Sequence, residues 1–353
     1  MPQRHDRFQQ LFPSQPTFRW TQMEEAFYRP EVSGWMSVKN VPKEVREVCE
    51  REIPWMSVSA KTVMVSKRGD THKALLTLSD GKEVESVLME NARGDWTICV
   101  SSQVGCAMRC AFCATGKMGL TRSLDSDEIS DQYRFWINYM RICGPEGLRT
   151  SRISNVVFMG MGEPLANYEN VKTTINTWLK RTDLGPTHIT VSTVGVLPRL
   201  EQILTDATWP HTRIAISLHS AVATTRKEIV PTSYDDFLPK LEDWAHRYQE
   251  VLGNRRHHLT FEYVMLKNVN DTEAHAKALA AFCSRIGDVR VNLIPYNFTD
   301  SEFTCSDDAA IARFLEILER ANVISTRRKT MGDDIAAACG QLIVLNTKPI
   351  ESV

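Results

Sequence analysis

The chain has 353 residues, of which 42% are hydrophobic and 24% charged, with a formal net charge of -1 and a pI of about 6.8. This composition excludes a disordered chain, and the length allows one large domain with a smaller accessory unit. The balanced charge excludes a strong overall attraction to polyanions or membrane surfaces. Because no signal-peptide core and no run of ~18 apolar residues is found, we expect a cytoplasmic protein without membrane contact.

Residues 1–95 are predicted to form an N-terminal accessory domain, because their pattern differs from that of the rest of the chain. A helix is expected at 43–52. The apolar runs 74–78 and 84–89 flank the turn residues 79–82, which is typical of two strands joined by a tight turn. A small β-sheet is therefore expected at the end of this unit.

Residues 96–353 alternate between apolar β-rich runs and helical patterns, which predicts an α/β core. Asp125, followed three residues later by Glu128, is typical of a capping box at the start of an amphipathic helix. The six predicted strands are 98–104, 155–159, 189–193, 213–218, 259–266 and 291–295. Parallel strands joined by helices carry their active sites at the carboxyl ends of the strands.

Chemically distinctive residues follow several of these predicted strands. Cys106, Cys110 and Cys113 form a C-x3-C-x2-C loop after the first one. In a reducing compartment a structural disulfide framework is not expected, which leaves metal binding, redox chemistry or inert core positions for the cysteines. Three thiolates can hold three irons of a four-iron cluster and leave one iron open for another ligand. The alternative is structural zinc, which normally requires a fourth nearby ligand, and none follows within this loop.

The loop, with Phe112 before its last cysteine, resembles that of the radical S-adenosylmethionine (SAM) superfamily. The resemblance implies a partial (β/α)6 TIM-like barrel and a [4Fe-4S] cluster whose open iron is chelated by SAM. It further implies that reduction yields a 5′-deoxyadenosyl radical, with an electron donor such as flavodoxin or ferredoxin. Glycines in 160–164 permit close approach of the backbone to a cofactor, and Glu163 can accept a hydrogen bond from its ammonium group.

Motifs between about residues 73 and 342 together resemble those of the RlmN/Cfr family of RNA adenosine methyltransferases. They lie at 99–106, 158–164, 192–195, 217–219 and 332–342. The resemblance implies that Cys339 takes a methyl group from one SAM, that a second SAM supplies the radical, and that Cys99 resolves the RNA-linked intermediate through a disulfide. It also implies that Glu85 assists proton removal from the adenine. Without the resemblance, Cys339 would be interpreted as a buried small residue and Glu85 as an exposed strand carboxylate.

The resemblance also implies a set of cofactor contacts. They are Gly162, Glu163, Ser192, Ser217, Leu218, His219 and Asn297. Without it, a strand-end histidine such as His219 is more often structural. The sequence departs from the family at 230–233, where Val-Pro-Thr-Ser replaces the usual Met-Pro-Ile-Asn. We interpret the remaining cysteines Cys49, Cys143, Cys283 and Cys305 as structural.

The expected substrate is an adenosine of 23S rRNA in the peptidyl-transferase centre, with the adenosine next to the tRNA anticodon as a second one, and the enzyme is expected to be a monomer. Residues 255–258 and 327–329 are basic and could contact RNA or form solvated faces. Glu163 with Pro164, and the run 261–266, favour RlmN-type methylation of carbon 2 over Cfr-type methylation of carbon 8. A different class of function, a non-catalytic iron–sulfur redox sensor or RNA-binding protein, would not need Cys339.

Overall fold

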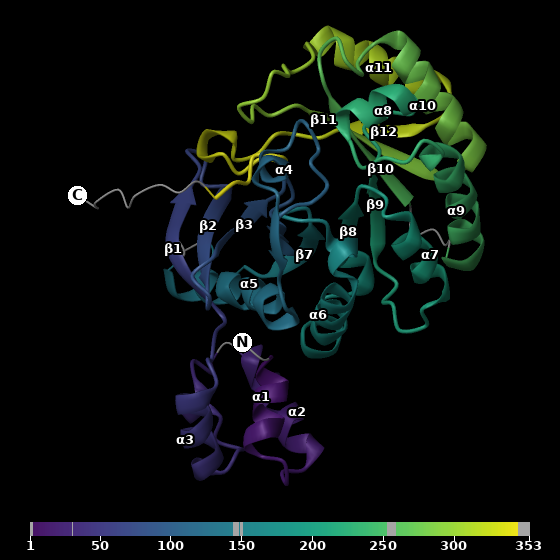
Figure 1. Cartoon of the computed structure of the whole chain (residues 1–353). Coiled ribbons are helices and arrows are strands. Elements are labelled where there is room, and N and C mark those ends of the chain that lie inside the picture. The colour runs from purple at the N-terminus through teal and green to yellow at the C-terminus, as the bar shows by residue number, and fades with distance from the viewer. Residues whose placement is uncertain (1–2, 30, 144–147, 149–150, 253–258, 345–353) are drawn as a thin grey trace.

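A computed structural model describes residues 3–29, 31–143, 148, 151–252 and 259–344 (Figure 1). One ten-stranded sheet runs through it in the order β1-β2-β3-β4-β7-β8-β9-β10-β11-β12, beside a two-stranded sheet of β5 and β6. The strands are β1 (Val58–Val65), β2 (Thr71–Leu78), β3 (Glu83–Glu90), β4 (Trp96–Cys99), β5 (Gln103–Gly105), β6 (Leu120–Ser123), β7 (Ile153–Phe158), β8 (Ile189–Thr193), β9 (Arg213–Ser217), β10 (Leu259–Met265), β11 (Val289–Pro295) and β12 (Ile324–Arg327).

At strand β4 the large sheet changes from antiparallel to parallel pairing. This strand pairs antiparallel with β3 on one side and parallel with β7 on the other. From β4 to β12 every neighbouring pair is parallel, so the last five of the six predicted strands are confirmed, the first is confirmed only as far as Cys99, and the short strand β12 is added at the edge. Within the described residues β12 pairs with β11 alone, which leaves the parallel part open as in a partial barrel. The predicted α/β class is confirmed.

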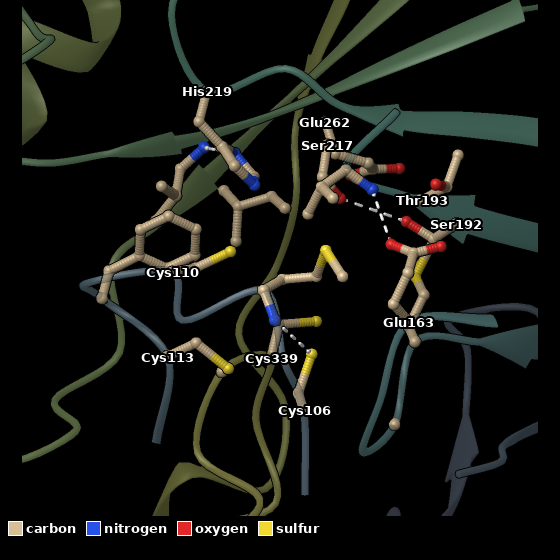
Figure 2. Close-up of a pocket in the computed structure, with 18 of the residues that line it drawn as sticks. Cys106, Cys110, Cys113, Glu163, Ser192, Thr193, Ser217, His219, Glu262 and Cys339 are labelled. Carbon is tan, nitrogen blue, oxygen red and sulfur yellow. Dashed lines mark hydrogen bonds between the residues drawn. The ribbon is translucent and has the colours of Figure 1, made fainter. Parts of the chain in front are cut away.

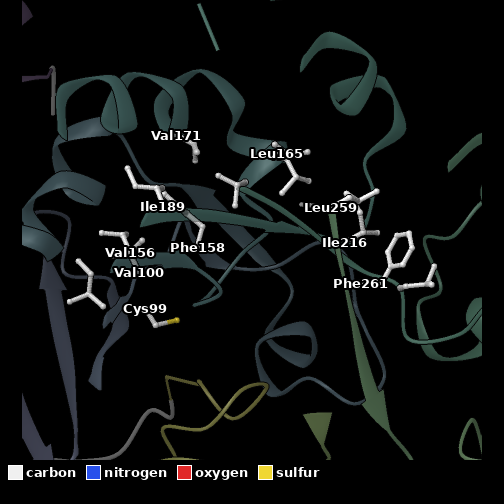
Figure 3. Packing of buried hydrophobic residues seen from close by; sticks show 14 of the residues in the cluster. Cys99, Val100, Val156, Phe158, Leu165, Val171, Ile189, Ile216, Leu259 and Phe261 are labelled. Atoms are coloured by element: carbon white, nitrogen blue, oxygen red, sulfur yellow. The ribbon is translucent and has the colours of Figure 1, made fainter. Parts of the chain in front are cut away.

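Helices cover the outer face of the parallel strands (Figure 1). They are α5 (Ser126–Asn138), α6 (Tyr168–Arg181), α7 (Leu197–Thr205), α8 (Ala223–Ile229), α9 (Phe237–Leu252), α10 (Glu273–Ile286) and α11 (Asp308–Arg320), with α4 (Ala114–Met118) and the short turns η2 (Tyr139–Cys143), η4 (Pro164–Asn167), η5 (Pro186–His188) and η6 (Asp333–Ile335) between elements. The capping box predicted at the start of α5 is confirmed, with Glu128 N donating to Asp125 Oδ1 at 2.8 Å. Apolar side chains between these helices and the sheet form the main core, and Figure 3 shows Cys99 at the edge of that packed layer.

The first helices form a small bundle with an apolar cluster of its own. They are α1 (Arg4–Leu11), α2 (Thr17–Phe27), η1 (Trp35–Ser37) and α3 (Lys43–Glu52), the last at the predicted position. The predicted strand, turn and strand are confirmed as β2 and β3, which pair with the strands of the large sheet and share its core. The division of the chain at residue 95 remains a prediction.

The first parallel strand is shorter than predicted, because a side chain and the backbone of another loop bind the residues that follow it. Ser101 N donates to Gln132 Oε1 at 2.8 Å, and Ser102 N donates to Met161 O at 2.8 Å. Val100 N still donates to Val157 O at 3.0 Å, so these bonds replace the strand ladder from Ser101 onward. The chain then enters β5, which pairs with β6, so that the cysteine loop crosses the carboxyl ends of the parallel strands.

After β12, the C-terminal segment 328–344 returns across the carboxyl ends of the strands toward β1–β3, where it is drawn in yellow (Figure 1). It is bonded at both ends of this path. Lys67 N donates to Asp334 Oδ2 at 2.8 Å, and Thr115 Oγ1 donates to Leu342 O at 2.6 Å. This path brings Cys339 to the cysteine loop.

Candidate active site

A cavity of about 890 Å³, including its open mouth, lies at the carboxyl ends of the parallel strands. The cysteine loop and the C-terminal segment close one side of it. Its chemically distinctive lining residues are Cys106, Cys110, Cys113, Gly162, Glu163, Ser192, Ser217, His219, Glu262, Arg328 and Cys339.

The predicted cluster loop lies between β5 and α4, and all three of its cysteines line this cavity (Figure 2). Burial raises the pKa of the Cys106 thiol to about 12 and also raises the pKa values of the Cys110 and Cys113 thiols. Thiols in such surroundings stay protonated unless a cation stabilises the thiolate, which a bound metal does. The loop therefore suits metal-bound thiolates better than free nucleophiles.

Neighbouring elements hold the cysteine loop in place. Ala111 N donates to Ile229 O at 2.9 Å, and Ala114 N donates to Gly340 O at 2.8 Å. The segment 230–233, where the sequence departs from the family, packs against the same loop through Thr232 Oγ1, which donates to Met108 Sδ at 3.8 Å. The segment in which the sequence differs from the family therefore helps to support the cysteine loop.

Glu163 faces the cysteines from the opposite side of the cavity (Figure 2). Its carboxylate accepts hydrogen bonds from Leu165 N and Val194 N, each at 2.9 Å, which ties it to the loop after β8. Burial raises its pKa to about 7, against the lowering effect of those two bonds. The preceding Gly162 has a φ of 104°, and a Cβ there would lie 2.6 Å from the Gln103 side chain. A glycine is therefore required for this loop to reach the cavity.

Glu163 gives the cofactor-free protein a pH-dependent stability that Glu163→Gln is expected to remove. The pKa in the folded state, about 7, lies above the ordinary value of 4.5. The folded state thus binds a proton that the unfolded chain releases, and this stabilisation, at most about 3 kcal/mol, is present below pH ~4.5 and lost as the pH rises through ~7. Urea unfolding of both proteins between pH 5 and 8 measures it. Identical pH profiles would contradict the assignment.

Ser192, Ser217 and His219 come to the cavity from the ends of β8 and β9, as expected from their strand-end positions. The two serine hydroxyls are 3.3 Å apart. His219 Nδ1 accepts a hydrogen bond from Val264 N at 3.1 Å, which leaves Nε2 as the N–H of the ring. Burial and the charge of Arg226 lower the pKa of His219 to about 3, so the ring is a neutral hydrogen-bond donor.

Two other predicted cofactor contacts do not line the cavity. The Leu218 side chain is fully buried in the core. Arg226, a buried side chain, donates to the Leu218 and Ser217 carbonyl oxygens and to Val194 O at 2.6 Å, so it ties the ends of β8 and β9 together. Asn297 instead donates to Cys339 O at 3.1 Å and so holds the C-terminal segment.

The cavity contains two charged residues that the sequence interpretation did not place there, Glu262 and Arg328. Asn292 Nδ2 donates to Glu262 Oε1 at 2.9 Å, and Arg328 Nη1 lies 3.5 Å from Glu262 Oε2. Arg328 was considered as part of a basic surface at 327–329. Alternation after β12 directs it inward while Arg327 and Lys329 are exposed, so the three do not form one patch. The other basic candidate, 255–258, lies outside the described residues.

Cys339 is exposed and lines the cavity next to the cysteine loop, whereas Cys99 is buried at the end of β4. Burial raises the pKa of the Cys99 thiol to about 12, a nearby charge on Cys339 raises it further, and Arg328 opposes both effects. The two cysteines and Arg328 are therefore within electrostatic range of one another. Cys49 and Cys283 are buried in apolar clusters, as expected for structural residues, and Cys305 is exposed; the Cys143 side chain lies outside the described part.

Glu85 is buried on β3, so the alternative of an exposed strand carboxylate is wrong. Lys73 Nζ lies 2.8 Å from Glu85 Oε1, and Ile343 N donates to Glu85 Oε2 at 2.9 Å. Burial raises the pKa of Glu85, while the charge of Lys73 opposes the shift. The carboxylate therefore contacts the C-terminal segment that carries Cys339.

A sequence model of the Radical SAM superfamily matches residues 100–279, which are just over half of the chain. The crystal structure of a radical SAM methyltransferase from Sphaerobacter thermophilus matches with a TM-score of 0.85 and 33% sequence identity, over 94% of each chain. The class of protein is therefore that of the radical SAM enzymes.

Two curated relatives carry the description "Probable dual-specificity RNA methyltransferase RlmN". The relative from Dictyoglomus thermophilum is 38% identical over 341 residues, which cover 95% of this chain and 92% of the relative. The relative from Bifidobacterium longum is 40% identical over 295 residues, which cover 81% and 73%. The chain belongs to the radical SAM superfamily and, within it, to the RlmN family of RNA methyltransferases.

Enzymes of this superfamily use a [4Fe-4S] cluster and SAM, and the cavity fits both groups. Within the described residues no three His, Cys, Asp or Glu side chains converge to hold a single metal ion. In a cluster each cysteine binds its own iron, so the thiolates need not converge. Glu163 and the two serine hydroxyls, on the opposite side, are hydrogen-bonding groups suited to the amino-acid portion of SAM.

Among the residues that the structure describes, no helix has the length and apolar character needed to span a membrane.

Proposed function

We propose that this enzyme adds a methyl group to carbon 2 of an adenosine in 23S rRNA, and to the adenosine next to the anticodon of tRNA, in the cytoplasm. One observation carries the proposal: the three-cysteine loop and Cys339 line one cavity, with Cys99 close enough to interact electrostatically with Cys339. The relatives described as dual-specificity RNA methyltransferases support an RNA substrate and more than one specificity.

In this proposal Cys106, Cys110 and Cys113 hold the cluster. Glu163, Ser192, Ser217 and His219 orient SAM, and Gly162 allows the close approach of the backbone. Bound in this way, the cluster and SAM supply a methyl group and a one-electron route to a carbon–hydrogen bond, with electrons from a donor such as flavodoxin or ferredoxin and two SAM molecules consumed per turnover. The protein acts as a monomer.

Cys339 then carries the methyl group, and its exposure in the cavity gives RNA access to it. Once the carbon–carbon bond has formed, a thioether joins Cys339 to the base. Cys99 attacks the sulfur of Cys339 to form a disulfide, the sulfur–carbon bond breaks, and the electron pair and a proton complete the new methyl group. Glu85 accepts the proton of the adenine, for which its raised pKa suits it.

Leu218 and Asn297 have supporting parts in this scheme. The Leu218 carbonyl is bound by Arg226, which fixes the turn that carries His219. Asn297 holds the backbone carbonyl of Cys339. We therefore propose that Asn297 holds Cys339, the methyl carrier, in position, in addition to any contact with SAM.

The product nucleoside distinguishes this function from its alternatives. RNA from a strain that lacks the gene, incubated with the purified enzyme, SAM and a reductant, is expected to yield 2-methyladenosine on mass spectrometry against authentic standards. A product of 8-methyladenosine would reject carbon 2 in favour of Cfr-type chemistry. If no 5′-deoxyadenosine and no methylated nucleoside were formed, a non-catalytic iron–sulfur sensor or RNA-binding protein would replace the proposal.

A further inference from the structure

Lys73, on β2, is a buried lysine paired with Glu85, with a side chain only 6% exposed. Lysines are almost never buried without a partner of opposite charge. In the strand register Lys73 lies opposite Val87, and Val87 lies opposite Cys99. Because side chains alternate along a strand, Lys73, Glu85 and Cys99 share one face of the sheet. The face is the one that the C-terminal segment crosses.

The Lys73 ammonium makes two contacts that belong to different parts of the chain. It lies 2.8 Å from Glu85 Oε1 and donates to Ala336 O at 3.1 Å. The other oxygen of the same carboxylate, Glu85 Oε2, accepts from Ile343 N at 2.9 Å. The ion pair thus binds the C-terminal segment at two points, 336 and 343, and Cys339 lies between them.

The backbone of the segment needs such support. Ala336 has a φ of 50°, in the left-handed region that residues other than glycine occupy only when their surroundings fix them. Its carbonyl is the one that Lys73 binds. Asn297, which donates to Cys339 O, adds a third attachment from the other side.

We propose that Lys73 is a positioning residue that couples Glu85 to the segment carrying Cys339, so that one ammonium group orients both the base and the methyl carrier. The inference rests on the function proposed above. A lysine suits this task because its compact ammonium carries three donors that can point to different acceptors. Loss of Lys73 is therefore expected to affect two steps. One is the methylation of Cys339, which does not need Glu85 as a base, and the other is methyl transfer to RNA, which does.

Hydrogen exchange tests the contact itself in the loaded protein without RNA. In Lys73→Met the amides of 336–343 are expected to exchange about tenfold faster, the change expected on losing one charge-assisted hydrogen bond. Amides of α11 should keep their rates, which verifies that the fold is intact. Lys73→Arg, which keeps the charge, should recover part of the protection. The matched control is Lys61→Met, which removes an exposed ion pair to Glu83 on a strand of the same sheet. It should leave 336–343 unchanged.

The fraction of methylated Cys339, measured by peptide mass spectrometry after incubation with SAM, tests the consequence. Lys73→Met is expected to lower the initial rate of Cys339 methylation about tenfold, in line with the exchange. Lys61→Met should stay within about twofold of wild type, because it leaves the contacts of Lys73 with Glu85 and Ala336 O in place. Transfer to RNA should fall in Lys73→Met.

Unchanged exchange in Lys73→Met, or faster exchange with undiminished methylation of Cys339, would overturn the role of Lys73. Failure of the proposed function would be recognised by a different result, because the wild type itself would then give no methylated adenosine. In that case the exchange rates still decide whether Lys73 holds the segment.

Discussion

Cys339→Ala is expected to give neither methylated protein nor protein–RNA adduct, whereas Cys99→Ala is expected to accumulate a covalent adduct with RNA and to release almost no product. The reason is chemical. A thioether between protein and base is stable, so a second thiol is needed to break it after the carbon–carbon bond has formed. Cys99 is buried at the end of β4, close enough to Cys339 for a charge there to raise the pKa of the Cys99 thiol.

Denaturing gel electrophoresis of each variant with labelled RNA measures this difference. The matched control is Cys305→Ala, since Cys305 is exposed and is not among the residues that line the cavity. This control should turn over like the wild type. An adduct with Cys339→Ala, or its absence with Cys99→Ala, would reject the division of roles between the two cysteines.

Replacing Cys106, Cys110 or Cys113 by alanine is expected to abolish SAM cleavage. With two thiolates left, a four-iron cluster has two irons without a protein ligand, and metal binding and the chemistry that depends on it should both be lost. Iron and sulfide content after anaerobic purification, together with the yield of 5′-deoxyadenosine, measures the effect. A single alanine variant with a full cluster and wild-type cleavage would show that the ligand has been assigned wrongly.

The sequence was sufficient for features whose signal is local. The spacing of the three cysteines defined the loop, and the apolar period with the capping box at Asp125 defined α5. Ser192 and Ser217 could be placed together because the carboxyl ends of parallel strands meet at one edge. In each case a few neighbouring residues, or one rule of topology, carry the information.

Features that depend on distant contacts could not be predicted. The pairing of β4 with β7 ends after Val100, because Gln132, on α5, binds the backbone of Ser101. Lys73 and Ala336 are 263 positions apart and meet through the path of the C-terminal segment. For Arg328 a local signal did exist, since alternation after a strand turns one of three successive basic residues inward. The interpretation of 327–329 as one basic surface did not take this alternation into account.

The central claim is that the methyl group reaches RNA through Cys339, and a single turnover with labelled protein tests it most directly. Enzyme carrying a carbon-13 methyl group on Cys339 is mixed with RNA, a reductant and unlabelled SAM, and the adenosine product is analysed by mass spectrometry. The account predicts that the first equivalent of methyladenosine contains carbon-13. An unlabelled first product, with the label retained on Cys339, would contradict it.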